Sequence, residues 1–421
     1  MLKRYEPKKG GGTPFYYGYV IVFASFIVMT MTFGIHYSFG VFFKPLMTEF
    51  GWTRAETSAA YSIMTLFSGL FGILAGRIGD FFGPRIIGTF AGVFLCVGFL
   101  LLSLANQLWH FYLFYGLVMA AGVGGCWPGL MPAVAKWFTR RRGLMSGIVA
   151  SGIGFGTIII PSLAEWLISN YDWRTAYIII GCFTLILVIG VSQFLKGSPK
   201  KIGEPADCEG DRDKGHPYPE ITGHKFSEAS RSRPFWLLCG VYYCYGYCLH
   251  TIMVHIAPWA QDLGISAGKS AIILAIIGAT SVISRIIIGG ASDKFGLKPS
   301  LIIGLIFMII SLLWVQIAQV PWMFYLFGIL FGIAYGGIIA LLVLAAAELF
   351  GLHSMGVILG TITFAYTLGG ATGPIVSGYL FDLLGSYRPA FFIAAFVAIV
   401  SISFALVLKL PGRRMQKPKP V

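Results

Sequence analysis

The sequence predicts an all-α membrane protein with twelve transmembrane helices in two six-helix halves. Three observations predict this class: an apolar composition, apolar runs of membrane-spanning length, and an internal repeat. Of the 421 residues, 57% are hydrophobic and only 11% are charged, and the mean hydropathy is +0.78. Soluble proteins carry about 25% charged residues. The composition therefore excludes a soluble globular enzyme and a disordered protein.

Each apolar run is about 20 residues long, enough to cross a hydrocarbon core of about 30 Å. Lipid offers no hydrogen-bond partner to the backbone, and the runs lack the period-two alternation of a β-barrel. Each run is therefore predicted to be a helix. The expected spans are residues 16–39, 54–78, 85–104, 109–135, 142–168, 174–195, 234–260, 268–291, 299–319, 321–347, 353–382 and 387–409.

The basic residues lie mainly outside the spans and orient the chain. Most of the 31 Lys and Arg residues fall in the termini and in alternate loops on one side, which is a positive-inside pattern. We expect residues 1–15, the linker 196–233 and residues 411–421 in the cytoplasm, with the bundles 16–195 and 234–410 in a bacterial inner membrane. The net charge of +14 thus requires no nucleic-acid partner.

The two halves match each other when the sequence is shifted by 213 residues. Glycines permit close approach of helices in lipid, where no hydrophobic force drives them together. Two parallel repeats joined by a linker are an architecture for alternating access around a midplane site. The coinciding pairs are Gly76 and Gly289, Asp80 and Asp293, Gly83 and Gly296, Gly124 and Gly337, Gly143 and Gly356, Gly147 and Gly360, Gly156 and Gly369, and Pro161 and Pro374.

A glycine-rich loop with one acidic residue follows the second span and recurs after the eighth. It reads Gly76-Arg-Ile-Gly-Asp80-Phe-Phe-Gly83-Pro-Arg85, and its repeat reads Gly289-Gly-Ala-Ser-Asp293-Lys-Phe-Gly296-Leu-Lys298. The pair resembles the signature loop of the major facilitator superfamily. Glycine permits a tight turn, and the acid can reach a helix N-terminus or a basic partner and latch one conformation. The resemblance implies gating roles for Gly76, Asp80, Gly83, Arg85, Gly289, Asp293 and Gly296.

Three further segments are similar to the monocarboxylate transporter and oxalate/formate antiporter branch of that superfamily. They are Trp137-Phe-Thr-Arg-Arg-Arg-Gly143-Leu-Met-Ser-Gly147, Val254-His255-Ile-Ala-Pro258-Trp-Ala-Gln-Asp262-Leu-Gly264-Ile-Ser266 and Ser284-Arg285-Ile-Ile-Ile-Gly289. The first segment adds Arg141 and Arg142 to the expected gating residues. The superfamily resemblance covers residues 16–410 and implies a secondary carrier.

Arg285 is the cation buried most deeply in a predicted span. It precedes Asp293 by eight residues, or about 12 Å of helix, which places it near the middle of the bilayer. An arginine there costs at least about 2.5–3.5 kcal/mol and normally faces a substrate path. No Asp or Glu lies at a similar depth, so a substrate carboxylate is the expected partner. The alternative is that Arg285 only bonds helix carbonyls or snorkels.

The resemblance also suggests what surrounds this arginine. In monocarboxylate transporters the arginine of the eighth helix binds the substrate carboxylate, and in the oxalate carrier a lysine of the eleventh helix adds a second charge. Alignment places Tyr366 where that lysine would stand, so one cation remains and a monoanion is favoured over a dianion. The same alignment implies that Tyr37, Trp127 and Tyr335 line the site, although aromatic residues in bundles more often serve packing.

Proton coupling has no evident carboxylate. Animal monocarboxylate transporters carry an acid four residues before the arginine, and Ser281 stands there in this chain. The protonatable alternatives are His36, His250 and His255, all within or near spans and able to titrate near neutral pH. His250 is favoured because it lies deepest in its helix, although a lone histidine in a bundle is more often simply satisfied by a neighbour.

The sequence thus predicts a secondary active transporter of small monocarboxylates, lactate-like or short aliphatic, with a proton as coupling ion and a monomer as the functional unit. No nucleotide-binding loop, metal-ligand cluster or nucleophile constellation appears, so neither an enzyme nor a cofactor or metal is expected. Three alternatives remain open: an oxalate/formate-type dicarboxylate exchanger, an exporter of amphipathic compounds, and a transporter-like anion sensor.

Overall fold

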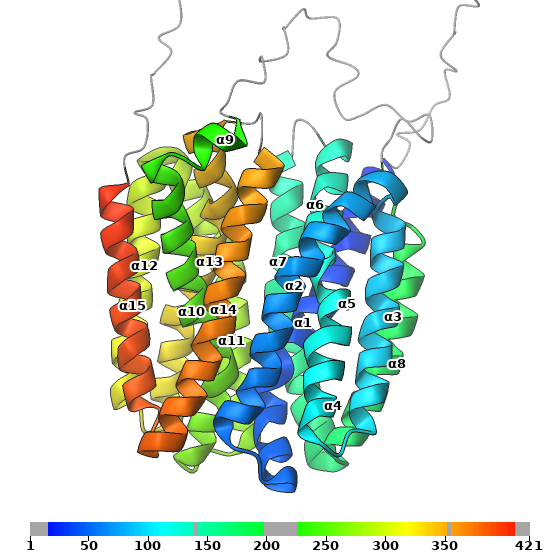
Figure 1. Cartoon of the computed structure of the whole chain (residues 1–421), viewed down its shortest axis with the longest axis vertical. Coiled ribbons are helices and arrows are strands. Elements are labelled where there is room, and N and C mark those ends of the chain that lie inside the picture. Colours follow the sequence, from blue (N-terminus) through cyan, green and yellow to red (C-terminus); the bar gives the residue numbers. More distant parts are fainter. Residues whose placement is uncertain (1–15, 139–141, 198–224, 352–354, 409–421) are drawn as a thin grey trace, which may run out of the picture.

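The computed structural model describes residues 16–138, 142–197, 225–351 and 355–408, which form a bundle of long helices (Figure 1). Side chains are not described at residues 76–81, 135, 142–143, 289–290, 293–294 and 355–356 within helices. The elements are α1 (Gly18–Phe50), α2 (Arg54–Phe82), α3 (Pro84–Ser103), α4 (Leu108–Leu113), the π-helical η1 (Phe114–Met119), α5 (Ala120–Gly124), α6 (Cys126–Trp137), α7 (Arg142–Asn170), α8 (Trp173–Ser192), α9 (Phe226–Ala229), α10 (Arg233–Asp262), α11 (Ala267–Phe295), α12 (Leu297–Trp314), the short η4 (Val315–Ile317), α13 (Pro321–Phe350), α14 (Met355–Leu384) and α15 (Arg388–Val407).

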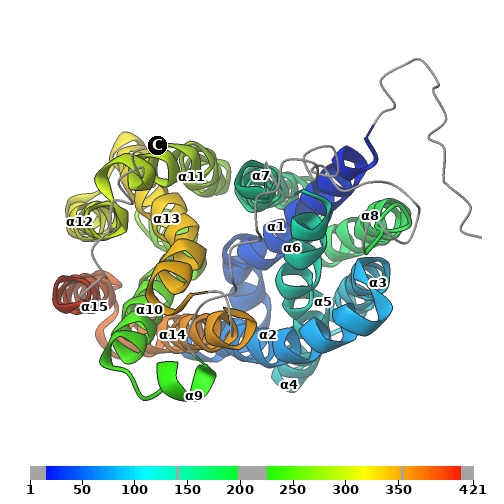
Figure 2. The ribbon, with the colours of Figure 1, turned by 90° about the horizontal axis from the view of Figure 1, so that it is seen from above.

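The helices divide into two groups, which Figure 2 shows side by side. We call α1 to α8 the N bundle and α9 to α15 the C bundle. Each has a hydrophobic core of its own, and the two cores meet at the interface. Tyr37 of α1 belongs to the core of the C bundle, and Val254 of α10 belongs to the core of the N bundle. The boundary between the bundles is therefore partly apolar.

Among the described residues, 11 helical segments are long and apolar enough to cross a membrane. One of them, Leu108–Val134, is assembled from α4, η1, α5 and α6. The remaining predicted span, 353–382, corresponds to α14, which has 30 residues but is not in that set. Helix α1 continues to Phe50, beyond its predicted span, because a helix can extend past the hydrocarbon core.

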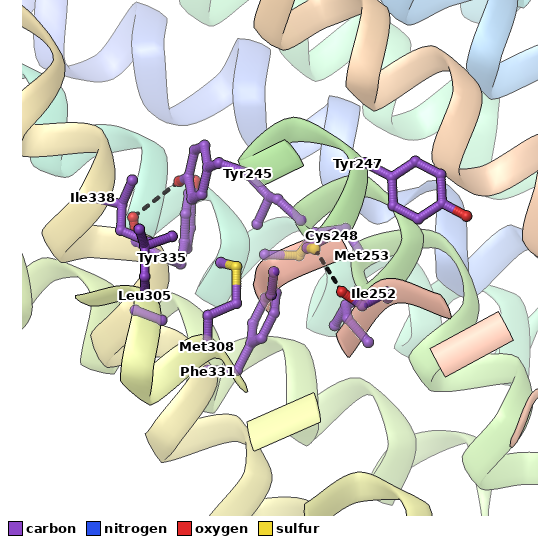
Figure 3. Close-up of a cluster of buried hydrophobic side chains, with 14 of the residues drawn as sticks. Tyr245, Tyr247, Cys248, Ile252, Met253, Leu305, Met308, Phe331, Tyr335 and Ile338 are labelled. Carbon is purple, nitrogen blue, oxygen red and sulfur yellow. Dashed lines mark hydrogen bonds between the residues drawn. The ribbon is translucent and has the colours of Figure 1, made fainter. Parts of the chain in front are cut away.

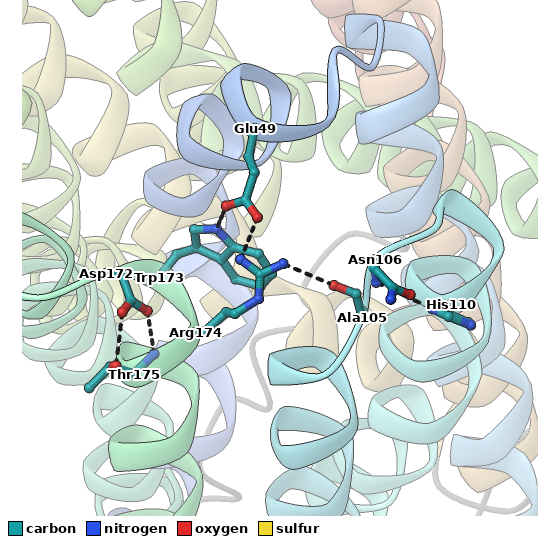
Figure 4. A network of polar contacts seen from close by, with 8 residues as sticks. All are labelled: Glu49, Ala105, Asn106, His110, Asp172, Trp173, Arg174 and Thr175. Atoms are coloured by element: carbon teal, nitrogen blue, oxygen red, sulfur yellow. Dashed lines mark hydrogen bonds and ion pairs between the residues drawn. The ribbon is translucent and has the colours of Figure 1, made fainter.

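Polar side chains fasten the end of α1 to the start of α8 (Figure 4). Glu49 accepts hydrogen bonds from the Trp173 indole and the Arg174 guanidinium. Asp172 caps α8 by accepting from the Thr175 backbone N–H at 2.7 Å. That bond is the main cause that lowers the pKa of the Asp172 carboxyl. These contacts fix the relative height of two helices within the N bundle.

Three helix pairs join the bundles: α2 with α14, α7 with α11, and α1 with α10. Small residues make the α7–α11 pair close. A Cβ added to Gly278 of α11 would lie 2.7 Å from the Gly154 carbonyl oxygen of α7. In contrast, a Cβ at Gly147 of α7 or Gly360 of α14 would meet no atom within 4 Å. Close packing of α7 against α11 therefore depends on glycine at positions 154 and 278.

Ion pairs join the bundles at the end of the molecule where α1 ends and α2 begins, which we call the distal end. Arg54, at the start of α2, pairs with Asp262 of α10 at 2.7 Å and donates to the Tyr387 hydroxyl at 2.7 Å. Lys44 of α1 also pairs with Asp262 at 2.7 Å. The backbone N–H of Arg54 donates to the carboxylate of Asp382, on α14, at 3.0 Å. This distal network closes the interface.

Candidate functional site

Arg285 lies on α11 against the opposing bundle. Its side chain is buried, and Nη1 donates to the Ala150 carbonyl of α7. Within the described parts of the chain, Nε and Nη2 are buried without a hydrogen-bond partner. These two groups share one edge of the guanidinium and form a fork that can hold both oxygens of a carboxylate. The arginine is thus anchored by one nitrogen and presents a free bidentate donor.

One tyrosine lies beside this arginine, and a second tyrosine from the opposite bundle lies beside the first. The guanidinium carbon of Arg285 lies 5.3 Å from the ring centre of Tyr335 on α13. Tyr37 of α1 lies edge-on to Tyr335, with 6.1 Å between ring centres. The Tyr335 hydroxyl is buried and has no hydrogen-bond partner among the described residues. The Tyr335 hydroxyl is therefore a further polar group next to the arginine fork.

Other residues of the C bundle pack against Tyr335. Tyr245 of α10 donates to the Tyr335 carbonyl at 3.0 Å and stacks on Tyr366 of α14 with 5.6 Å between ring centres. Figure 3 shows Tyr245 and Tyr335 beside the core residues Met308 and Phe331. Close packing restricts rotation of the Tyr245 and Tyr335 rings, so their positions beside Arg285 are fixed before a substrate binds.

Two predicted histidines are brought together and one is not. His36 of α1 and His250 of α10 both contact the hydroxyl of Tyr61, at 2.8 Å and 2.7 Å. His255 instead bonds the Tyr387 hydroxyl and the Pro374 carbonyl, both at 2.9 Å, within the C bundle. His255 thus has its two ring nitrogens satisfied beside the distal network, away from the other pair.

Other predicted residues have structural surroundings. Trp127 of α6 is half-buried and packs against both cores. Ser281, at the place of the family's acid, is buried and donates to the Gly278 carbonyl of its own helix at 2.8 Å. Ser281 therefore carries no charge to the site, and Trp127 lies at the meeting of the two bundles.

The repeated loops place one glycine alike in each bundle. Gly83, before α3, has φ +89°, and Gly296, before α12, has φ +91°. Only glycine adopts this conformation without strain, which explains why both repeats keep it. Arg85 donates to the Gln193 side chain of α8 at 2.8 Å. Of the other predicted gating residues, Arg141 and the side chains of Asp80, Asp293 and Arg142 lie outside the described residues, as do the side-chain surroundings of Gly76 and Gly289.

Sequence reasoning missed Tyr61 and Arg54, although both join the two bundles. Tyr61 is completely buried in α2, and its contacts on α1 and α10 are distant in sequence. The sequence around Arg54 indicates only the start of a helix, because its partners Asp262 and Asp382 lie in the other bundle. Neither residue stands out in the sequence, because this part of α2 also carries several Ser and Thr residues.

Two bundles of long apolar helices, with a buried cation that has no acidic partner among the described residues, are typical of an integral membrane transporter. The profile described as the Major Facilitator Superfamily matches residues 21–291 and 244–421. The chain belongs to the Major Facilitator Superfamily, and it is a transporter rather than an enzyme.

Within this superfamily, the chain is similar to several monocarboxylate transporters. The chain is 26% identical to monocarboxylate transporter 12 of Mus musculus, over 99% of this chain and 90% of that protein. It is 25% identical to monocarboxylate transporter 13 of Rattus norvegicus, over 100% and 98%. A bacterial homologue of the human lysosomal transporter Spinster, solved inward-facing and occupied, superposes with a TM-score of 0.71 at 17% identity, over 94% of this chain and 97% of that one. This last likeness concerns the fold.

Proposed function

We propose that the protein is a secondary active transporter of small monocarboxylates, lactate-like or short aliphatic anions. The observation that carries the proposal is the free Nε and Nη2 fork of buried Arg285. A desolvated guanidinium needs an anion, and a planar carboxylate matches the fork. The similarity to monocarboxylate transporters points to the same class of cargo.

The charge of the site favours a monoanion over a dianion. The family alignment places Tyr366 where a second cation would stand, and Tyr366 is a neutral phenol that bonds to His250. A second carboxylate would remain without a counter-charge in a site of low dielectric constant, at a cost of several kcal/mol or more. Free hydroxyls such as that of Tyr335 suit a substrate with a 2-hydroxyl or a 2-oxo group.

Transport then follows by rocking of residues 16–195 against residues 234–410 about the midplane. The distal network closes one side, and we place the distal end outside a bacterial inner membrane, with both chain termini in the cytoplasm, from the distribution of Lys and Arg. A proton is the coupling ion, and the monomer is the transporting unit.

The test is uptake of radiolabelled L-lactate, acetate and oxalate into proteoliposomes with an imposed inward proton gradient. Arg285→Gln should abolish accumulation, and Arg285→Lys should retain only a small part because ammonium lacks the fork. Arg388→Gln is the matched control, since Arg388 is an exposed arginine at the start of α15. Accumulation that survives in Arg285→Gln would refute the proposal. Counterflow restricted to oxalate would replace it by dicarboxylate exchange.

A further inference from the structure

A chain of polar side chains crosses the interface between the bundles. His36 and Tyr61 belong to the N bundle, and His250 and Tyr366 belong to the C bundle. The Tyr61 hydroxyl lies 2.8 Å from Nε2 of His36 and 2.7 Å from Nδ1 of His250. Nε2 of His250 lies 3.0 Å from the Tyr366 hydroxyl. At its other end, Nδ1 of His36 lies 3.1 Å from the Met64 sulfur.

The end partner fixes the direction of these hydrogen bonds. A thioether sulfur can only accept, so Nδ1 of His36 carries its hydrogen and Nε2 of His36 accepts from Tyr61. Because Tyr61 has one hydrogen, it must accept from Nδ1 of His250. Nε2 of His250 then accepts from Tyr366. With both imidazoles neutral, each hydrogen lies on Nδ1, and every bond has its donor on the Tyr366 side and its acceptor on the Met64 side.

We propose that Tyr61 passes the coupling proton between His250 and His36, across the boundary of the two bundles. The proposal rests on the proposed function, since it supplies the coupling group where Ser281 has no charge. A proton delivered through the Tyr366 hydroxyl binds Nε2 of His250. The Nδ1 proton of His250 then moves to the Tyr61 oxygen while the Tyr61 hydroxyl proton moves to Nε2 of His36.

The step is balanced in atoms and charge. His250 returns to the neutral form with its hydrogen on Nε2, Tyr61 keeps one hydrogen, and His36 becomes the imidazolium. Only N–H and O–H bonds change. The positive charge has moved from the C bundle to the N bundle. The reverse sequence releases the proton.

Among the titratable groups in this part of the structure, the two imidazoles are the best proton acceptors. The neighbouring titratable groups are phenols: Tyr37 of α1 beside both rings, Tyr61 of α2, Tyr366 of α14 and, next to Tyr37, Tyr335 of α13. From α11, the cation Arg285 faces Tyr335. Acidic residues of these helices lie near helix ends, as Glu49, Glu56, Asp262 and Asp382 do. Neutral phenols bind protons far less readily than imidazole does.

Rocking of the bundles makes the transfer conditional on conformation. Tyr61 and His250 lie on opposite bundles, so separation at this level breaks their 2.7 Å contact. Tyr366 also links the chain to the substrate neighbourhood, because it stacks on Tyr245, which bonds the Tyr335 carbonyl. The proton-transfer residues and the Arg285 site are therefore connected through the contacts of Tyr366, Tyr245 and Tyr335.

The first test reads transport in proteoliposomes with L-lactate as the probe. Tyr61→Phe should lower proton-driven accumulation by about tenfold or more, the scale on which a positioned proton-transfer group contributes. Lactate–lactate exchange without a proton gradient should remain close to that of the wild type. Tyr115→Phe is the matched control, since Tyr115 is equally buried near Phe39 and its hydroxyl has no partner among the described residues. Unchanged accumulation in Tyr61→Phe, or loss of exchange as well, would overturn the proposal.

The second test needs no substrate and separates the two proposals. Nitrogen NMR of histidine-labelled protein in bilayers should show His36 and His250 both neutral with the hydrogen on Nδ1. In Tyr61→Phe, His250 should move its hydrogen to Nε2 and donate to Tyr366, while Tyr115→Phe leaves both signals unchanged. Unaltered histidine signals in Tyr61→Phe refute the relay. If the wild type shows these signals but transports no carboxylate, the proposed substrate class is wrong and the proposed proton transfer through Tyr61 still stands.

Discussion

Replacing Arg54 by Gln should open the distal end. Arg54 pairs with Asp262 at 2.7 Å, donates to Tyr387 at 2.7 Å, and places its guanidinium carbon 3.7 Å from the ring centre of Phe381. Hydrogen bonds with charged groups contribute about 1.5–3 kcal/mol, and a desolvated cation–π contact about 2 kcal/mol. Water replaces part of this in the open state, so a net loss of about 2 kcal/mol is expected. That corresponds to a shift of about 30-fold toward the open state.

The assay is a distance distribution between spin labels at the distal end. Trp109→Cys of the N bundle and Leu384→Cys of the C bundle are exposed positions for the labels, in a background without the native cysteines. Arg54→Gln should increase the population at longer distances. Arg174→Gln is the control, since Arg174 pairs with Glu49 within one bundle at the same end. An unchanged distribution in Arg54→Gln, or an equal shift in Arg174→Gln, would refute the role of the distal network.

Three other predictions concern packing, stability and charge movement. Gly278→Val should slow transport sharply, because its Cβ would meet the Gly154 carbonyl at 2.7 Å, whereas Gly147→Ala, with open space around it, should transport like the wild type in the same uptake assay. Asp172→Ala should lower the melting temperature at pH 7 by about 2–4 °C through loss of the α8 cap. Because the pKa of Asp172 is lowered in the fold, that difference should persist above the ordinary Asp pKa and vanish as the pH falls through the folded value, which thermal unfolding across pH would follow. Finally, a monoanion moving with one proton is electroneutral, so lactate uptake should not respond to a membrane potential imposed with potassium and valinomycin; stimulation by an inside-positive potential would contradict symport.

The sequence was sufficient to predict the architecture because helix length and apolarity are local properties. Spans could be placed from runs of about 20 residues, and the shift of 213 residues related Gly83 to Gly296, which share one unusual backbone conformation. Arg285 was also identifiable from sequence, since a cation at that depth is costly wherever it points. The family resemblance added the class of cargo.

Cross-bundle contacts were beyond sequence reasoning. Tyr61 and His250 are 189 residues apart, and Arg54 and Asp382 are separated by 328 residues. Helix rotation decides which side chains meet, and in lipid the apolar pattern that normally reveals rotation is nearly uniform. His255 illustrates this, because it lies on the same helix as His250, and yet its partners are Tyr387 and Pro374.

The sharing of core residues between the bundles has a consequence for how the protein is made. Tyr37 of α1 is buried in the core of the C bundle, and Val254 of α10 is buried in the core of the N bundle. Either half made alone would lose this packing, on which association of helices in lipid depends. We expect the two halves, expressed as separate chains, to be stable in the membrane only when both are present.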